Sequence, residues 1–257
     1  MTQGLLSMNK MILHIPHSST IIPDNSGYVV NEEVLKNELK RLTDWFTNEL
    51  FYSEKDITVK ADFSRLFCDV ERFIDDEQEV MASVGMGVLY SHLDSGELMR
   101  EVNPELRKRI LNEFYIPHHK RLTEAVEGEL ARVGKALIVD CHSFPKIPLK
   151  RALDQRLNRP DFNIGTDPYH TPSELVKILE TFLKSKGFSV GLDWPYSGSI
   201  VPLKFFRKEK QVHTVMIEVN RRLYLDERGC MKNEKFDEVS ETCNQILSLL
   251  RVESLGI

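Results

Sequence analysis

The chain has 257 residues, of which 41% are hydrophobic and 28% are charged, a balance typical of a soluble globular protein, and we expect one domain over residues 1–257. The formal net charge of −5 and the lack of a basic cluster argue against a nucleic-acid partner, and no apolar stretch is long enough to span a membrane. The four cysteines are widely spaced and no secretory signal is evident, which predicts a cytoplasmic protein with reduced thiols.

The first part of the chain predicts strands on either side of a long helix. Residues 11–15 form a short apolar run that ends before a proline, as strands often do. Residues 30–54 carry apolar side chains at helical spacing and predict one continuous helix. Residues 56–62 and 64–70 predict two further strands.

The middle of the chain predicts a second long helix followed by a buried strand. Residues 103–134 begin with Asn-Pro and end at a glycine, which are typical helix boundaries, and Pro117 inside this range should kink or break the helix. Residues 135–142 are almost continuously apolar, as in a strand that is buried on both faces. We expect residues 143–170 to form a long loop with a functional role.

The last third of the chain continues the alternation of helices and strands. A capping box at 171–174 predicts a helix that ends at Gly187, residues 212–219 predict a central strand, and residues 234–252 predict a closing amphipathic helix. This alternation predicts an α/β fold, a three-layer α/β/α sandwich around a mostly parallel or mixed central sheet.

Polar side chains lie at or near the predicted ends of three strands. His17 follows the first strand, His142 ends the buried run, and Glu218 lies near the end of the strand at 212–219. Sites in open α/β sheets form at the carboxyl ends of strands, and two imidazoles with a carboxylate suit a catalytic zinc centre. The alternative is that the histidines are hydrogen-bonded loop residues and that Glu218 pairs with an arginine. His14 has the other strand parity, so we expect its side chain to point elsewhere.

Eight short motifs occur in one order along the chain. They are IPHSSTIIP, TDWFTNELF, SRLFCDVER, YIPHHKRL, VDCHSFP, DFNIGTD, WPYSGS and IEVNRRLYLDE, and they lie between about residues 11 and 227. Together they resemble the N-formylglutamate amidohydrolase family, which is grouped with the zinc carboxypeptidase-like hydrolases. The resemblance implies that fold, and it implies that both strand-end histidines converge on one metal ion, Zn²⁺ or another divalent ion, per chain.

The resemblance also implies the individual metal ligands. His17 matches the histidine of the family's first motif, and His142 matches that of a D-x-H-S motif. Asp44 matches the aspartate of a Thr-Asp-Trp motif and is the expected third ligand, on a helix able to face the sheet end, although an acidic helix residue is often solvated. Asp140 and Asp69 are the rival third ligands. Asp140 shares a strand face with His142, so a hydrogen bond that orients this imidazole is an equally good role for it.

Two arginines are expected to bind the substrate. Arg72 matches the family's Asn-Arg pair, which resembles a carboxylate clamp because a planar guanidinium binds a carboxylate through two hydrogen bonds. Glu71 occupies the asparagine position, and this departure bears on the substrate because an acidic neighbour can pair with Arg72 or repel an acidic substrate. Arg65 is the second candidate. The alternative for both arginines is a structural salt bridge.

Two more residues are placed with the substrate-binding group. His119 matches a family Pro-Tyr-His motif in which His118 replaces the tyrosine, and its alternative is a helix-surface histidine without a role. Ser143 follows His142 in the D-x-H-S motif. We therefore expect both side chains near the bound substrate.

The function implied by the resemblance is that of a metal-dependent amidohydrolase acting on an N-acyl amino acid, with N-formylglutamate the family's namesake substrate. Zinc would polarise the amide carbonyl and acidify a bound water, while Glu218 would accept the water proton and return it to the leaving amine. Two alternatives stay open: a zinc hydrolase of another amide, such as a different acyl-amino acid or a cell-wall peptide, and a non-catalytic homologue that binds metal or ligand. The oligomeric state is not given by the sequence.

Overall fold

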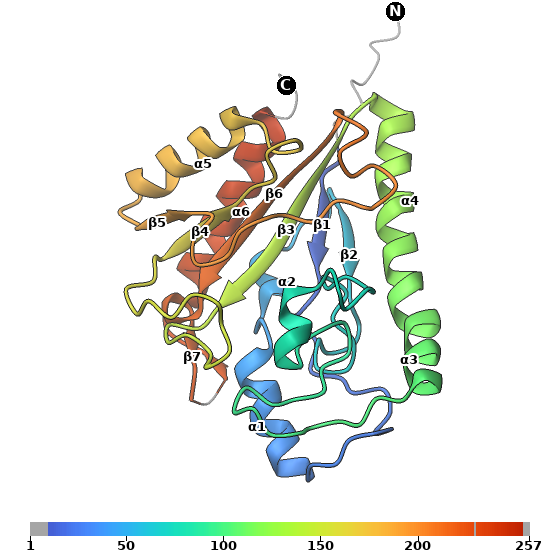
Figure 1. Ribbon diagram of the computed structural model, residues 1–257. Coiled ribbons are helices and arrows are strands. Elements are labelled where there is room, and N and C mark those ends of the chain that lie inside the picture. The colour runs from blue at the N-terminus through green and yellow to red at the C-terminus, as the bar shows by residue number, and fades with distance from the viewer. Residues whose placement is uncertain (1–9, 229, 254–257) are drawn as a thin grey trace, which may run out of the picture.

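A six-stranded mixed β-sheet runs through the centre of the structure, a computed structural model that describes residues 10–228 and 230–253 (Figure 1). Its strands are β1 (Ile12–Ile15), β2 (Ile57–Lys60), β3 (Ala136–Phe144), β4 (Phe162–Gly165), β5 (Val190–Leu192) and β6 (Val212–Asn220). They occur in the order β2-β1-β3-β6-β4-β5. The first four strands in this order are parallel neighbours, β4 is antiparallel to β6, and β5 is parallel to β4.

Helices cover both faces of the sheet (Figure 1). They are α1 (Glu32–Leu42), α2 (Thr47–Leu50), α3 (Pro104–Ile110), α4 (Ile116–Val133), α5 (Ser173–Ser185) and α6 (Phe236–Glu253). Shorter elements are the 3₁₀ turns η1 (Val80–Val84) and η3 (Arg221–Leu223) and the hairpin of β7 (Leu225–Asp226) and β8 (Met231–Lys232). Helices α2, α5 and α6 pack on one face and α4 on the other. The predicted mixed sheet flanked by helices is confirmed, and the zinc carboxypeptidase-like assignment stays a prediction.

Alternate side chains of a strand pack into the cores on opposite faces of the sheet. In β3, Leu137, Val139 and Cys141 pack with α5 and α6, whereas Ile138 packs with α4. Because side chains alternate between faces, Asp140 and His142 share the face of Ile138. The continuous apolar run thus covers both faces, and its two polar residues lie together at the carboxyl end of the strand.

The predicted helix over 30–54 is interrupted, which changes the position of Asp44. Helix α1 ends at Leu42 and α2 begins at Thr47, and Phe46 between them has a left-handed backbone with φ of 60°. The backbone N–H of Asp44 donates to the carbonyl of His17 at 3.0 Å. Asp44 therefore lies in the break and not on a helix, and this backbone bond ties it to the loop after β1.

The predicted strand at 64–70 is wrong. The carbonyl of Ser64 accepts the backbone N–H groups of Phe67 and Cys68, which bends the segment into turns. The side chains of Phe67 and Cys68 pack in a separate core cluster beside the sheet. These local bonds and this second cluster take the place of strand pairing.

The segment at 143–170 is not a loop throughout, because it contains β4. This strand has only four residues, all buried, and it extends the sheet beyond β6. Such a short apolar run is easily taken for part of a loop. The segment between the end of β3 at Phe144 and the start of β4 at Phe162 does form a long loop.

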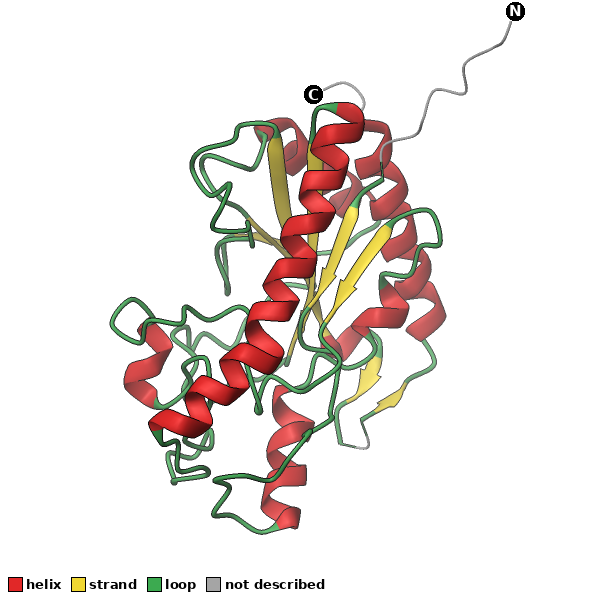
Figure 2. Cartoon of the chain, turned by 90° about the vertical axis from the view of Figure 1, so that its right-hand side faces the viewer, coloured by secondary structure: helices red, strands yellow, loops and turns green. Residues whose placement is uncertain are grey.

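Pro117 does not break the helix in which it lies. Helix α3, a π-helical turn over Leu111–Tyr115 and α4 follow one another without interruption, and Figure 2 shows them as one long rod. Pro117 is the second residue of α4, which begins directly after the π turn. The π turn directly before it accommodates the change in hydrogen bonding.

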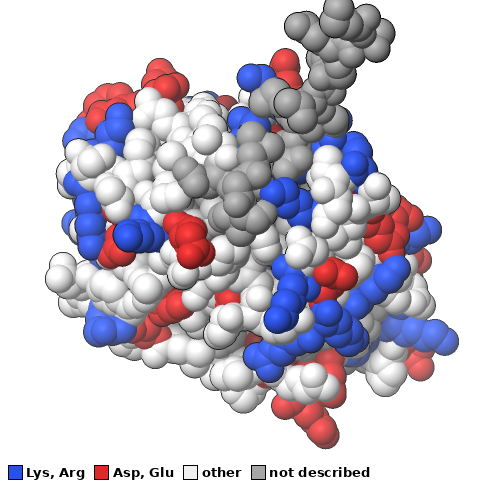
Figure 3. Space-filling view, turned by 90° about the horizontal axis from the view of Figure 1, so that it is seen from above, with Lys and Arg blue, Asp and Glu red and all other residues white. Residues whose placement is uncertain are grey.

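Figure 3 shows the face of the molecule at which the parallel strands begin. Basic and acidic side chains are interspersed on this face, so it carries no extended field of one sign (Figure 3). Within the described residues, no helix is long and apolar enough to cross a membrane. The polar strand ends lie at the opposite end of the sheet (Figure 1).

Candidate active site

The carboxyl ends of β1, β3 and β6 bring the predicted strand-end residues together. His142 is the direct cross-strand partner of Glu218, and the ring centroids of His17 and His142 are 5.1 Å apart. All three side chains are buried, and they line one cavity of about 170 Å³. The expected convergence of these three residues is present.

His17 has one satisfied ring nitrogen and one that lacks a partner. Its Nε2 lies 2.8 Å from Oδ1 of Asp69, a hydrogen bond to a carboxylate. Its Nδ1 is buried and makes no hydrogen bond, with the nearest oxygens of Asp44 and Glu71 at 3.7 and 3.9 Å. A buried ring nitrogen without a partner is unusual, and a bound ion would satisfy it.

His142 lies between carboxylates on both sides of its ring. Its Nε2 is 3.1 Å from Oδ1 of Asp140 and 3.2 Å from Oε2 of Glu71. Its Nδ1 is 3.1 Å from Oδ2 of Asp44. Burial alone would lower the pKa of His142, but Glu71, Asp140 and Asp44 together hold it well above its usual value.

Asp44 contacts groups from three parts of the chain: His17, the His142–Ser143 pair and Arg221. Its Oδ2 accepts the backbone N–H of Ser143 at 3.2 Å and faces both histidine rings. Its Oδ1 accepts from the Arg221 guanidinium at 2.9 Å. Burial would raise the pKa of Asp44, but hydrogen bonds to His142 and His17 and the charge of Arg221 hold it well below the usual range. Asp44 is therefore a preorganised, ionised carboxylate.

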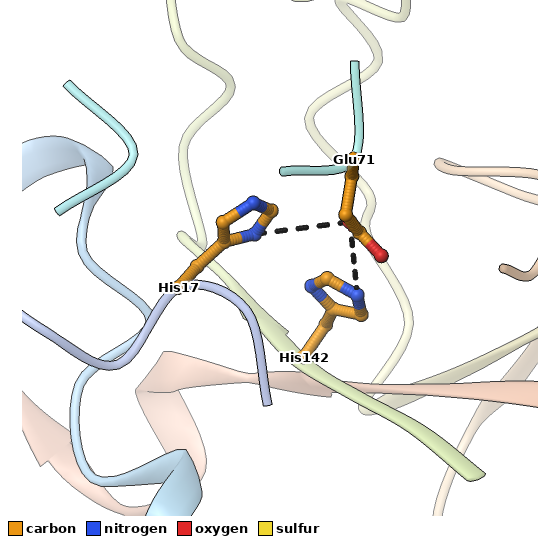
Figure 4. Close-up of side chains that lie close together, drawn as sticks. All are labelled: His17, Glu71 and His142. Carbon is orange, nitrogen blue, oxygen red and sulfur yellow. Dashed lines mark ion pairs between the residues drawn. The ribbon is translucent and has the colours of Figure 1, made fainter. Parts of the chain in front are cut away.

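Glu71 is a second carboxylate beside the histidine pair, and it was not predicted as a ligand. One ligand atom each from His17, Glu71 and His142 lies within 4.8 Å of the others, and Figure 4 shows the Glu71 carboxylate above the two rings. The Glu71 side chain is 19% exposed, whereas that of Asp44 is 2% exposed. The pair of histidines thus has two carboxylates within reach, on different sides of the His142 ring.

The hydrogen bonds of the two histidine rings show which of their nitrogens remain available for an ion. Both Nε2 atoms already lie against an aspartate, Asp69 for His17 and Asp140 for His142. Metal-binding histidines usually donate their second ring nitrogen to such a partner, which fixes the ring and leaves the other nitrogen for the ion. The two remaining Nδ1 atoms both face Oδ2 of Asp44. His17, Asp44 and His142 thus bring two ring nitrogens and one carboxylate oxygen together on one side of the rings, with Asp69 and Asp140 against the other two nitrogens.

The two predicted substrate-binding arginines line the cavity and also make ion pairs. Arg65 donates to Oδ2 of Asp69 from Nε at 3.1 Å and from Nη2 at 2.9 Å. Arg72 lies 3.6 Å from Asp69 and 3.7 Å from Glu79, and its buried Nε has no hydrogen-bond partner. Arg65 is thus committed to Asp69, while Arg72 keeps a free donor.

His119 and Ser143 lie at different distances from the cavity. The ring of His119 hydrogen bonds to the carbonyl of Val70 at 2.7 Å and lines a neighbouring cavity of about 360 Å³. Ser143 lines the first cavity, and its hydroxyl oxygen accepts from Nε of Arg221 at 3.2 Å. The structure therefore brings Ser143, but not His119, to the cavity of His17 and His142.

His14 is part of the polar network, contrary to the expectation that it points elsewhere. Its Nδ1 lies 2.8 Å from Oδ1 of Asp140, and its Nε2 lies 2.9 Å from Nε2 of His118. His14 and His118 are both fully buried. As the strand parity predicted, His14 does not line the first cavity. The parity did not predict that Asp140 contacts both His14 and His142.

Sequence reasoning also missed Arg221, which holds Asp44. Its guanidinium donates to the carbonyls of Arg41 at 2.7 Å and Ser143 at 3.2 Å in addition to Asp44. The only signal available was a pair of arginines directly after a buried strand. Its bonds to two distant segments, one with Arg41 and Asp44 and one with Ser143, could not be inferred from that pattern.

Comparison with known proteins assigns the chain to a family. Residues 9–225 match the family model described as N-formylglutamate amidohydrolase. The chain belongs to the N-formylglutamate amidohydrolase family. It is 27% identical over 231 residues to an N-formylglutamate deformylase of Pseudomonas aeruginosa. The aligned region covers 85% of this chain and 83% of that protein. It is 26% identical over 228 residues to an N-formylglutamate deformylase of Pseudomonas putida, covering 84% and 82% of the two chains.

Solved structures of similar proteins share the fold of this family member. The crystal structure of an N-formylglutamate amidohydrolase from Ralstonia eutropha superposes with a TM-score of 0.84 at 25% identity, covering 96% of this chain and 95% of that one. A protein from Agrobacterium tumefaciens superposes with a TM-score of 0.66 at 17% identity, covering 94% and 90%. The central, mostly parallel sheet flanked by helices is thus shared with the N-formylglutamate amidohydrolase structure.

The choice between Asp44 and Glu71 as the carboxylate ligand can be tested with two isosteric variants. Asp44→Asn should weaken the tightest Zn²⁺ site by at least ~10–100-fold, because it removes the charge that both Nδ1 atoms face. Glu71→Gln should weaken that site less than Asp44→Asn does, because Oε2 of Glu71 lies nearest Nε2 of His142, which already lies against Asp140. The measurement is competition with a chromophoric chelator, with the folded fraction checked by circular dichroism. The reverse order of the two effects would assign the ligand role to Glu71.

Proposed function

We propose that this chain is a metal-dependent amidohydrolase that cleaves the amide bond of an N-acyl amino acid, with N-formylglutamate as the first candidate substrate. The family membership and the names of the relatives support the substrate class. One observation carries the proposal: two imidazoles present Nδ1 to one carboxylate, with the unpartnered Glu218 in the same cavity. This arrangement supplies a place for an ion and a proton acceptor beside it.

Zn²⁺ is the ion that this donor set suits best, because two ring nitrogens and one carboxylate oxygen form a common catalytic zinc site with an open position. His17, Asp44 and His142 would hold it, one ion per chain. When bound there, it would polarise the scissile carbonyl and acidify a water molecule. Asp69 and Asp140 would keep the two rings turned toward the ion.

Glu218 is the proposed general base. Its Oε2 is buried without a hydrogen-bond partner, so this oxygen is available to a water in the cavity. Burial, partly offset by the charge of His142, raises the pKa of Glu218 to about 7. A carboxylate poised near neutral pH can accept a proton from the attacking water at Oε2 and then donate it to the leaving amine.

Arg72 is the proposed partner of the substrate carboxylate. Its unpartnered Nε and its position in the cavity wall leave a donor for an anionic group. Arg65, bound to Asp69 at the same wall, adds positive charge, and Ser143 offers a hydroxyl group. Together these residues would orient the amino-acid part of the substrate so that its amide lies next to Glu218.

A different acyl-amino acid is the second candidate substrate, favoured by a specific observation. Glu71 stands at the asparagine position of the family motif, next to Arg72, and both residues also line the neighbouring cavity of about 360 Å³. His119 lies in that cavity as well. The added volume would accommodate an acyl group larger than formyl, so the substrate panel should include N-acetyl and longer N-acyl glutamates.

Glu218→Gln tests the reaction. The variant keeps the shape of the side chain but cannot accept a proton, so kcat on N-formylglutamate should fall by about 10²–10⁴-fold while the metal content is unchanged. The rate is normalised to bound metal and folded protein, and Glu234→Gln, at an exposed position, is the matched control. A loss of less than tenfold after this normalisation would remove Glu218 from the reaction.

Arg72 is tested by its effect on substrate binding. Arg72→Ala and Arg72→Lys should both raise KM for N-formylglutamate by at least about tenfold, because lysine cannot form the two-point contact of a guanidinium. Arg121→Lys on the exposed side of α4 serves as the control. Unchanged steady-state kinetics of Arg72→Ala on any substrate of the enzyme would exclude a contact between Arg72 and that substrate.

A further inference from the structure

We propose that His14, Glu71 and Asp140 form a second divalent-metal site next to the one held by His17 and His142. This inference rests on the proposed metal-dependent function and adds a second ion to it. One ligand atom from each of the three residues lies within 4.8 Å of the others. Nδ1 of His14 is 2.8 Å from Oδ1 of Asp140 and 3.6 Å from Oε1 of Glu71. One imidazole and two carboxylates are a donor set for Zn²⁺ or Mn²⁺.

Two of these ligands, His14 and Asp140, also contact a second group on the side away from the proposed ion. The second ring nitrogen of His14 lies 2.9 Å from Nε2 of the fully buried His118. The second oxygen of Asp140 accepts the backbone N–H of Ile200 at 3.1 Å. Ligands of a metal site usually have such outer partners, which fix their direction before the ion binds.

Glu71 lies between His14 and the pair of His17 and His142. Its Oε1 is the oxygen nearest His14, and its Oε2 is the one near His142 at 3.2 Å and His17 at 3.9 Å. Oε1 is therefore the oxygen that would bind the second ion, while Oε2 faces Nε2 of His142, the ring nitrogen that lies against Asp140.

The local charges favour a cation at this position. Among the described residues, the ion pairs of Asp140 and Glu71 are formed with histidines and not with lysine or arginine. A neutral imidazole offers a single N–H, yet both carboxylates approach the same Nε2 of His142 and the same Nδ1 of His14. The two carboxylates therefore share their imidazole donors, and a divalent ion bound between them would give both a common cationic partner.

The neighbouring cavity provides access and room for further ligands. Glu71 and Asp140 both line the cavity of about 360 Å³, and Glu71 also lines the cavity of His17. Water molecules in this space would complete the coordination of the second ion. The side chains of His14 and Asp140 are themselves buried, so the ion would enter past Glu71.

The experiment is a count of bound ions in the full-length protein. The wild type, saturated with Zn²⁺ or with Mn²⁺ and then freed of unbound metal by gel filtration, should carry two ions per chain by mass spectrometry. Glu71→Gln, at the partly exposed ligand, and His14→Gln should each carry one ion. The ion that remains should be the one at His17 and His142, which the His17→Ala variant loses. His213→Gln, on β6 but outside both clusters, should keep two.

The possible results separate this inference from the proposed function. One ion in the saturated wild type, with the count unchanged in Glu71→Gln, would overturn the second site and leave His14 as part of a hydrogen-bonded chain, while the proposed function would stand. Two ions in the wild type and also in both variants would overturn it as well. No ion in the wild type would contradict the proposed function itself. The wild-type count decides the matter even if a variant does not fold.

Discussion

Two hydrogen bonds between imidazoles and buried aspartates determine the geometry of the site. Nε2 of His17 lies against Asp69, and Nε2 of His142 lies against Asp140, which turns both Nδ1 atoms toward Asp44. Without these bonds either ring could rotate, and the two nitrogens would no longer share one carboxylate. Both aspartates are buried, and their hydrogen-bond partners keep them ionised. The residues packed around them are therefore needed for the geometry of the site.

Part of this site could be predicted because strand geometry obeys simple rules. His17, His142 and Glu218 lie at the carboxyl ends of strands that are parallel neighbours, so their convergence follows from the alternation of strands and helices. The two-residue period of a strand similarly places Asp140 beside His142. The proximity of Asp44 came from the family resemblance and not from its spacing, since the helix expected to carry it is interrupted at that residue.

The remaining residues could not be predicted because their positions depend on long-range packing. Asp69 and Glu71 follow a segment that was predicted as a strand but forms turns, held by the carbonyl of Ser64 and by a core cluster separate from the sheet. Arg221 reaches Asp44 across 177 positions of the sequence. No local pattern encodes such contacts. Membership of the N-formylglutamate amidohydrolase family therefore fixes the framework, whereas the charges of this site depend on long-range contacts such as those of Asp69, Glu71 and Arg221.

The direction of the two imidazoles is the central claim, and anomalous diffraction from a crystal grown with Zn²⁺ tests it most directly. The strongest zinc peak should lie about 2.0–2.1 Å from Nδ1 of both His17 and His142, with a carboxylate oxygen of Asp44 completing the set. Asp69 and Asp140 should remain hydrogen bonded to the two Nε2 atoms. A strongest peak bound through Nε2 of either histidine, or the absence of a zinc peak at these residues in zinc-saturated crystals, would contradict the account.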